Sequence, residues 1–367
     1  MGSVAGVDLS GERIKRHAAV STVLGLLSDR ELEARLDSAP LVSDGIGGAA
    51  VRLDVDGIPV FAKRTPATEL ELRKEHRRST ANIFDVPPYC HYGLGVLGGG
   101  TVWRELAAHV MTTNWVLEGR NPHFPLLHHW RVLSLPGRLS SEDREADVAF
   151  WGGSAQVRER LEQLEDARDS VVLFCEYFPM NLHDWLYDRI ADGTIDDVVE
   201  DVETQVVESV LAMNRDGLLH CDTHFRNFVT DGTRIHIADF GLATSDRFTL
   251  SADERAFCDL NRTHDGCYVV THLVNWLVHA LAEQDGRIAY IRRVAEGHAA
   301  DPLPPKTRVI VERYAPIAAV LNNFYAKLRG EDRAVPFPAA ELAKACAANG
   351  FQPGCHGIAE LSGHRPT

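Results

Sequence analysis

Two polar clusters that flank one short predicted β-hairpin constrain this chain more than any other feature of its sequence. The first cluster is His220-Cys221-Asp222-Thr223-His224-Phe225-Arg226-Asn227, and the second is Asp239-Phe240-Gly241. The β-type runs 228–229 and 234–238 lie between them and are separated by the turn residues Asp231-Gly232. Because both clusters border the same hairpin, we expect their polar side chains to face one site.

The residue types in these clusters suit phosphoryl transfer. Asp222 is expected to orient an attacking hydroxyl and to accept its proton. Asn227 and Asp239 supply hard oxygen ligands, which favour a Mg²⁺ ion that bridges nucleotide phosphates. The alternative is a turn rich in His and Asp that only shapes a loop. Three matching residues at this spacing, next to predicted strands, favour the catalytic interpretation.

In the motifs His-x-Asp-x-x-x-x-Asn at 220–227 and Asp-Phe-Gly at 239–241, the chain resembles the protein-kinase-like superfamily. That superfamily includes the aminoglycoside and choline kinases, and the chain looks like an atypical bacterial protein-kinase-like member. The resemblance extends over residues 40–285. It implies an α+β, bilobal fold with a β-rich N-lobe and a mainly helical C-lobe. It also implies ATP and Mg²⁺ as cofactors.

The resemblance further implies a lysine at the end of an N-lobe strand and a glycine-rich loop before it, both contacting nucleotide phosphates. Lys63 fits the lysine, with an exposed strand-end lysine as the alternative. Gly45, Gly47 and Gly48 resemble the loop, whose backbone approaches phosphate closely. Ala50 replaces the third glycine of the pattern, so an ordinary hairpin connection is the alternative here.

A helix glutamate should pair with this lysine, and we expect Glu105 to be that residue. Glu105 precedes the run Asn121-Pro122-His123-Phe124-Pro125-Leu126-Leu127, which resembles the helix-then-strand passage of atypical protein kinases. The alternatives nearer in sequence are Glu69, Glu71 and Glu75, but their segment lacks a clear apolar face. A Glu105 that lies on the surface or at an interface is a further alternative.

Three more positions follow from the resemblance. The backbone of the link Glu176-Tyr177-Phe178 is expected to hold the adenine, and Asp184 either reaches the ribose or caps a helix. Asp265 resembles the buried aspartate that supports the catalytic loop from a later helix, with a simple helix start as the alternative.

The chain departs from regulated protein kinases next to the predicted catalytic residues. Cys221 replaces the arginine that reads a phosphorylated activation loop, and no Ala-Pro-Glu element follows. His224 stands where serine/threonine kinases have a lysine, and Arg226 matches an arginine of tyrosine kinases. We expect His224 to face the substrate and Arg226 either to share this role or to pair with a surface acid. His220 completes the predicted catalytic set.

The order of predicted elements gives the domain organisation. Residues 1–39 form a helical extension, residues 40–178 an N-lobe, and residues 179–367 a helical C-lobe. The N-lobe contains insertions at 65–102 and 136–170. Within it we expect a hairpin at 51–62 around Asp56-Gly57, a helix at 103–117, a polar loop at 136–149, a helix at 155–168 and a strand at 171–177. C-lobe helices are expected at 182–190, 195–215, 268–283, 288–296, 307–329 and 339–348.

Composition excludes several classes of protein. The net charge of −14 disfavours nucleic acid as a partner, because duplex binding requires Lys and Arg to neutralise phosphates. The seven cysteines are scattered and odd in number, which indicates reduced thiols. The sequence has neither a long apolar run nor a signal pattern, so we expect a cytoplasmic protein without a membrane span.

Three functions remain compatible with these residues. The first is a kinase for a Ser or Thr hydroxyl of a protein or peptide, including a biosynthetic variant in which the phosphorylated hydroxyl is then eliminated. The second is a kinase for a small molecule such as an aminoglycoside or amino alcohol, favoured by the short segment after Gly241. An acidic run at 184–201 would attract a cationic substrate of this kind. The third is a pseudokinase subunit. The N-terminal helices dock either on this chain or on a partner protein.

Overall fold

The computed structural model describes residues 9–45, 48–95, 100–136, 143–282, 286–330 and 333–354. The protein is mixed α+β, which confirms the predicted class. Its chain divides into two compact units. Unit 1 contains the described residues within Met1–Ser79 and Thr101–Phe178, together with Gly95. Unit 2 contains those within Thr80–Leu94 and Pro179–Thr367, together with Gly100.

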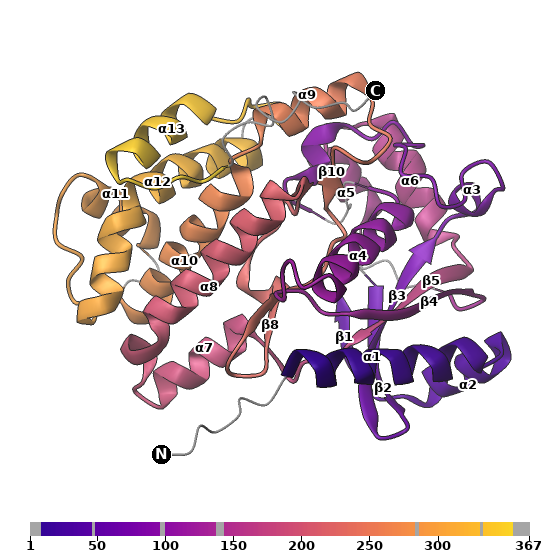
Figure 1. The fold of residues 1–367 in the computed structure, drawn as a ribbon. Coiled ribbons are helices and arrows are strands. Elements are labelled where there is room, and N and C mark those ends of the chain that lie inside the picture. The colour runs from indigo at the N-terminus through magenta and orange to yellow at the C-terminus, as the bar shows by residue number, and fades with distance from the viewer. Residues whose placement is uncertain are drawn as a thin grey trace, which may run out of the picture. The chain divides into compact units, whose positions relative to one another are not determined.

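Unit 1 is built on a five-stranded antiparallel sheet of order β1-β2-β3-β5-β4 (Figure 1). The predicted hairpin is confirmed, with Val55 opposite Ile58 across the turn. Asp56 and Gly57 both have positive φ, of 52° and 83°, as a tight two-residue turn between twisted strands requires. The strands are β1 (Leu41–Gly45), β2 (Gly48–Val55), β3 (Ile58–Ala67), β4 (Leu127–Leu133) and β5 (Asp169–Glu176).

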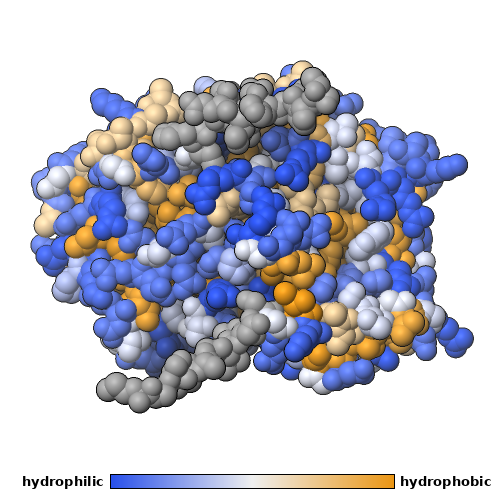
Figure 2. All heavy atoms as spheres, viewed as in Figure 1, coloured by the Kyte–Doolittle hydropathy of each residue, from blue (hydrophilic) through white to orange (hydrophobic). Residues whose placement is uncertain are grey.

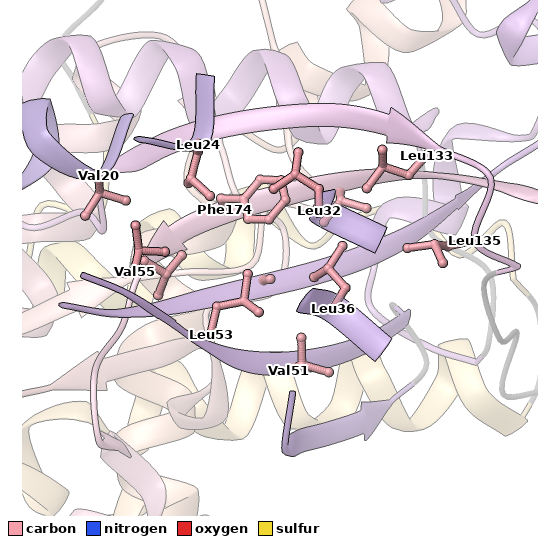
Figure 3. Packing of buried hydrophobic residues seen from close by; sticks show 13 residues of the cluster. Val20, Leu24, Leu32, Leu36, Val51, Leu53, Val55, Leu133, Leu135 and Phe174 are labelled. Carbon is pink, nitrogen blue, oxygen red and sulfur yellow. The ribbon is translucent and has the colours of Figure 1, made fainter. Parts of the chain in front are cut away.

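The N-terminal helices α1 (Leu9–Leu26) and α2 (Asp29–Ser38) cover one face of this sheet. Ser28 begins α2 through a capping box with Glu31. Figure 3 shows Leu24, Leu32 and Leu36 packed against Phe174 and other side chains from this face of the sheet. The N-terminal helices therefore bury Leu24, Leu32 and Leu36 on the sheet of their own chain.

The opposite face of the sheet is covered by α4 (Val102–Leu117). Side chains alternate along β5, so that Val172 and Phe174 face α1 and α2 while Val171 and Leu173 face α4. Trp103 is the largest side chain that α4 buries there. The sheet is thus buried on both faces.

Three short helices complete unit 1: α3 (Glu69–Leu72), α5 (Arg144–Phe150) and α6 (Ala155–Glu165). The prediction of a loop over 136–149 is wrong from Arg144 onward, because α5 begins there behind an Asp143 cap. Val148 is the residue of this short helix that becomes buried, so the sequence carries almost no apolar periodicity at this point.

A pair of histidines joins α1 to β4. The Nδ1 atoms of His17 and His128 lie 3.0 Å apart, so one neutral ring donates to the other. Burial lowers the pKa of His128 to about 3, and the neighbouring His17 and Arg13 add to this effect. The pKa of His17 is also lowered, mainly by burial. Both rings are therefore held in the neutral form.

We expect the protein to lose about 2 kcal/mol of folding stability between pH 7 and pH 5 through His128 alone. The folded pKa lies below the unfolded value of 6.5, so the unfolded chain binds more protons, and stability falls as the pH drops below 6.5. Urea unfolding at both pH values measures this loss, which should shrink by about that amount in His128→Gln. The exposed His298→Gln serves as the control, and an unchanged pH dependence in His128→Gln contradicts the assignment.

Unit 2 is mainly helical, with two small sheets, β6-β8-β9 and β7-β10. Its helices are α7 (Leu182–Ala191), α8 (Ile195–Arg215), α9 (Ala252–Leu260), α10 (His264–Leu281), α11 (Arg287–Ala295), α12 (Pro305–Gly330) and α13 (Ala339–Ala348), with the 3₁₀ turns η1 (Pro88–His91) and η2 (Phe225–Asn227). Its strands are β6 (Met180–Asn181), β7 (Leu218–Leu219), β8 (Phe228–Thr230), β9 (Ile235–Ile237) and β10 (Thr244–Ser245). The helix α9 was not predicted, although Ser251 and Glu254 form the capping box that marks its start.

The surface agrees with the charged composition. Figure 2 shows a face on which hydrophilic residues predominate and apolar patches are scattered. Among the described residues, no helix has both the length and the apolar character that a membrane span requires.

Candidate active site

The loop that carries the first polar cluster, residues 220–227, is held in place by hydrogen bonds to Asp265. This carboxylate is fully buried near the start of α10 and accepts the backbone N–H groups of His220 (2.6 Å) and Cys221 (2.9 Å). The amide of Asn214 on α8 donates to it as well, at 2.9 Å. Cys221 has a φ of +65°, a strained conformation for a residue with a side chain. The loop is bent sharply here because Asp265 holds both of these N–H groups.

Asp265 is ionised despite its burial. Burial by itself raises the pKa of this carboxyl, but the hydrogen bond from His264 and the electrostatic effect of the neighbouring His264 and His220 rings lower it more, so the pKa lies below its usual value. The Nδ1 of His264 lies 3.1 Å from Asp265 Oδ1, and its Nε2 bonds the Tyr325 hydroxyl at 2.8 Å. Asp265 is therefore a fixed anion under the loop rather than a simple helix start.

His220 connects the two polar clusters. Its Nε2–H donates to the carbonyl of Ala238 at 2.9 Å, and its Nδ1 accepts the Asp222 N–H at 3.3 Å. The ring is fully buried, so the structure places His220 behind Asp222 rather than on the open side of the loop. It links the residue before Asp239 to the backbone of Asp222.

Asp222 and Asn227 lie in direct contact. The Asn227 amide donates to the Asp222 carbonyl at 3.0 Å and to its Oδ2 at 3.2 Å. These bonds fix the orientation of the amide and turn its oxygen away from Asp222. The Oδ2 atom of Asp222 is thereby held by Asn227, and this bond does not involve the Oδ1 atom.

Asp239 lies two residues beyond the end of β9, and its neighbour Ala238 bonds Asn227. The β8–β9 pairing sets Phe228 opposite Ile237, and the Ala238 N–H donates to the Asn227 carbonyl at 2.7 Å. Asp239 has a φ of +59°, and its Oδ1 accepts the Gly241 N–H at 3.2 Å. A carboxylate and an amide oxygen on adjacent strand ends are the hard oxygen donors that Mg²⁺ prefers, so this donor set fits a magnesium ion.

His224 and Arg226 point to different partners. The Nε2 of His224 lies 3.4 Å from Asp222 Oδ2. Burial lowers the pKa of His224, but the Asp222 hydrogen bond and the Asp222 and Asp239 charges outweigh it and raise the pKa above its usual value. Arg226 is exposed and lies 3.7 Å from Asp184 on α7. The structure thus brings His224 to Asp222 and leaves Arg226 paired with a surface acid.

In unit 1, Lys63 and Glu105 form a buried ion pair. Lys63 Nζ lies 2.7 Å from Glu105 Oε1, and the Thr65 hydroxyl donates to Glu105 Oε2 at 3.2 Å. Among the alternatives, Glu71 caps α3 and accepts the Val102 N–H at 2.9 Å, while Glu69 and Glu75 are exposed. Glu105 is therefore the glutamate that contacts Lys63.

The glycine-rich segment connects β1 and β2. Gly45 pairs with Gly48, and Gly47 lies outside the described residues. Gly48 has a φ of +114°, and a Cβ there would lie only 2.1 Å from the carbonyl oxygen of Arg64 on β3. This glycine is thus required by the packing of the hairpin itself, whatever else the loop binds.

The predicted link at 176–178 has a partner that the sequence did not indicate. The Glu176 carboxylate lies 2.6 Å from Arg13 of α1, and Arg13 also donates to the carbonyls of Phe124 and Pro122. The Glu176 N–H donates to the Leu126 carbonyl at 2.8 Å, and Phe178 ends unit 1. No motif marks Arg13, because its role depends on where α1 packs.

The structure therefore brings together two groups of predicted residues. Unit 1 joins Lys63 to Glu105, and unit 2 joins Asp222 to Asn227 and His224. His220 links this group to the carbonyl of Ala238, the residue before Asp239. No protein-family model matches the chain, and a search of curated proteins finds no match either.

Proposed function

We propose that the protein is a kinase of the protein-kinase-like type, in which units 1 and 2 are the two lobes. It transfers the γ-phosphoryl group of ATP to a hydroxyl in a Mg²⁺-dependent reaction. The observation that carries this proposal is the unit 2 constellation, in which Asp265 and His220 fix a loop that presents Asp222 and Asn227. A turn that only shapes a loop does not need the buried Asp265 and His220 to hold in place the carboxylate and the amide that the loop presents.

Asp222 orients the acceptor hydroxyl in this reaction. Its Oδ2 is held by Asn227 and His224, so Oδ1 is the atom that accepts the hydroxyl proton. The acceptor oxygen forms a bond to the γ-phosphorus, the bond from that phosphorus to the β,γ-bridging oxygen breaks, and ADP leaves. Asn227 and Asp239 would hold Mg²⁺, which when bound neutralises charge on the phosphates.

Two basic side chains of the protein would complement the phosphates. Lys63, which is oriented by Glu105, would bind the nucleotide phosphates as a point charge. Burial lowers the pKa of His224, but Asp222 and Asp239 outweigh that effect and raise the pKa above the usual value. His224 is therefore the residue beside Asp222 that can stabilise the transferring group as charge develops.

The acceptor that we favour is a Ser or Thr hydroxyl of a peptide or protein. Part of the acidic run at 184–201, which would attract a cationic small molecule, is paired with other residues of this chain. Asp196 accepts the Thr307 N–H at 2.8 Å, and Glu200 lies 2.8 Å from Lys306. Asp184 itself lies beside Arg226. The second candidate, a small-molecule kinase, keeps the same mechanism and is favoured by the short segment between Gly241 and α9.

Metal-dependent nucleotide binding tests this proposal. Asp239→Asn should weaken the affinity for ADP at saturating Mg²⁺ by about 10- to 100-fold, because a ligand-shell carboxylate is lost. Without the metal, the wild type and the variant should bind ADP equally. Isothermal titration calorimetry with Mg²⁺ and with EDTA measures both, and Asp188→Asn, an exposed residue of α7, is the control. Equal Mg²⁺ dependence in Asp239→Asn and the wild type contradicts the metal assignment.

A further inference from the structure

Residues 80–94 belong to unit 2, although they precede α4 in the sequence. Three hydrogen bonds fasten this segment to the chain that follows Asp239. The Thr80 hydroxyl accepts the Thr249 N–H at 2.9 Å, His91 Nδ1–H donates to the Leu242 carbonyl at 2.8 Å, and the Tyr92 hydroxyl donates to Asn261 at 2.9 Å. The segment is therefore a fixed part of the region around the catalytic loop.

Tyr92 is the main anchor of the segment. Its side chain is buried, and its ring lies 5.2 Å from each of the rings of Phe257 and Phe324 and 5.7 Å from that of His264. His264 also bonds Asp265, which holds the catalytic loop. The anchor thus connects the segment to the same buried residues that position Asp222.

Gly93 follows this anchor and is exposed next to Asp222. It has a φ of +62°, and a Cβ at this position would lie 2.8 Å from Asp222 Oδ1 and 3.1 Å from its Cγ. The carboxylate cannot simply move aside, because Asn227 and His224 hold its Oδ2. Where this segment approaches Asp222 Oδ1, it therefore presents a backbone without a side chain.

We propose that Gly93 is a specificity-determining residue of the acceptor site, which rests on the proposed kinase function. The anchored segment forms a wall beside Asp222, and its bare glycine leaves the space through which the acceptor hydroxyl approaches Oδ1. Any side chain at position 93 occupies that space. The wall therefore acts on the approach of the acceptor to Asp222.

The test compares Gly93→Ala with Gly193→Ala. Gly193 is an exposed unit 2 glycine with a similar φ of +70°, and a Cβ there meets nothing within 4 Å. Gly193→Ala therefore introduces a backbone strain similar to that of Gly93→Ala, without a steric contact. Each protein receives Mg²⁺ and γ-labelled ATP with one of two acceptor pools, a peptide library containing Ser and Thr or a mixture of amino alcohols and aminoglycosides. Transfer to the pool, release of inorganic phosphate to water, and ADP affinity are measured together.

Gly93→Ala should lower transfer about 100-fold relative to Gly193→Ala, because a displacement near 1 Å at the reacting atoms has an effect of this size. The ratio of transfer to hydrolysis should fall at least about tenfold, because water is small enough to pass the added methyl group. ADP affinity should not change. If both glycine variants keep the wild-type ratio, or if transfer and hydrolysis fall together, Gly93 does not shape acceptor access. A wild type that neither binds ADP nor labels either pool contradicts the kinase function itself.

Discussion

Asp222→Asn is expected to lower phosphoryl transfer by roughly 10²- to 10⁴-fold, the range in which a positioned general base contributes. The amide keeps the size of the carboxylate and can still accept from Asn227 and His224, so the loop should keep its shape. What the variant loses is the group that accepts the hydroxyl proton. ADP binding should therefore stay within about twofold of the wild type, since an interaction made only during the reaction is removed.

Two measurements check this result. Labelled ATP gives the rate of transfer, and calorimetry gives the ADP affinity of the same protein preparation. Asp188→Asn, on the exposed side of α7, removes the same charge from unit 2 and should transfer at the wild-type rate. If Asp222→Asn keeps near-full activity, Asp222 is not the group that accepts the hydroxyl proton.

Asp265→Ala is expected to lower the free energy of unfolding by roughly 3–5 kcal/mol, the range measured when one partner of a buried charged network is removed. The N–H groups of His220 and Cys221 and the amide of Asn214 then lose their acceptor inside the protein. Each buried group without a partner costs about 1–3 kcal/mol. Because the strained conformation of Cys221 depends on these bonds, the catalytic loop should also lose its shape.

Urea unfolding monitored by circular dichroism measures the first effect, and hydrogen exchange of the amides at 218–222 measures the second. Asp197→Ala removes an exposed carboxylate from the first turn of α8 and should change stability by about 0.5 kcal/mol or less. If Asp265→Ala and Asp197→Ala unfold at the same urea concentration, Asp265 does not support the loop.

The elements that were predicted well are those whose signals are local. Asp56-Gly57 marks a turn that needs positive φ at both residues, and the structure has it. The long amphipathic helix α8 was predicted with the correct bounds, because its apolar face repeats over many turns. The Lys63–Glu105 contact was expected from the resemblance, and it could not come from spacing alone, because it depends on how α4 packs on the sheet.

The features that the sequence did not indicate depend on tertiary packing. Arg13 reaches Glu176 only because α1 docks on β4, and no local pattern marks that contact. Residues 80–94 have little regular structure, and hydrogen bonds to residues far along the chain fix their place beside Asp222. Gly93 is one glycine among many in the sequence. Its importance follows from the position of Asp222 Oδ1, which appears only in three dimensions.

The most direct measurement of the central proposal is transfer of label from γ-labelled ATP to a hydroxyl acceptor, with Mg²⁺ or with EDTA. The wild type should label the Ser- and Thr-containing peptide pool only when Mg²⁺ is present, and Asp222→Asn should label that pool at least about 100-fold more slowly. Label that appears instead in the amino alcohol and aminoglycoside pool keeps the mechanism and changes the acceptor. No label in either pool, together with no shift in melting temperature on adding ATP and Mg²⁺, contradicts the proposal that this protein is a kinase.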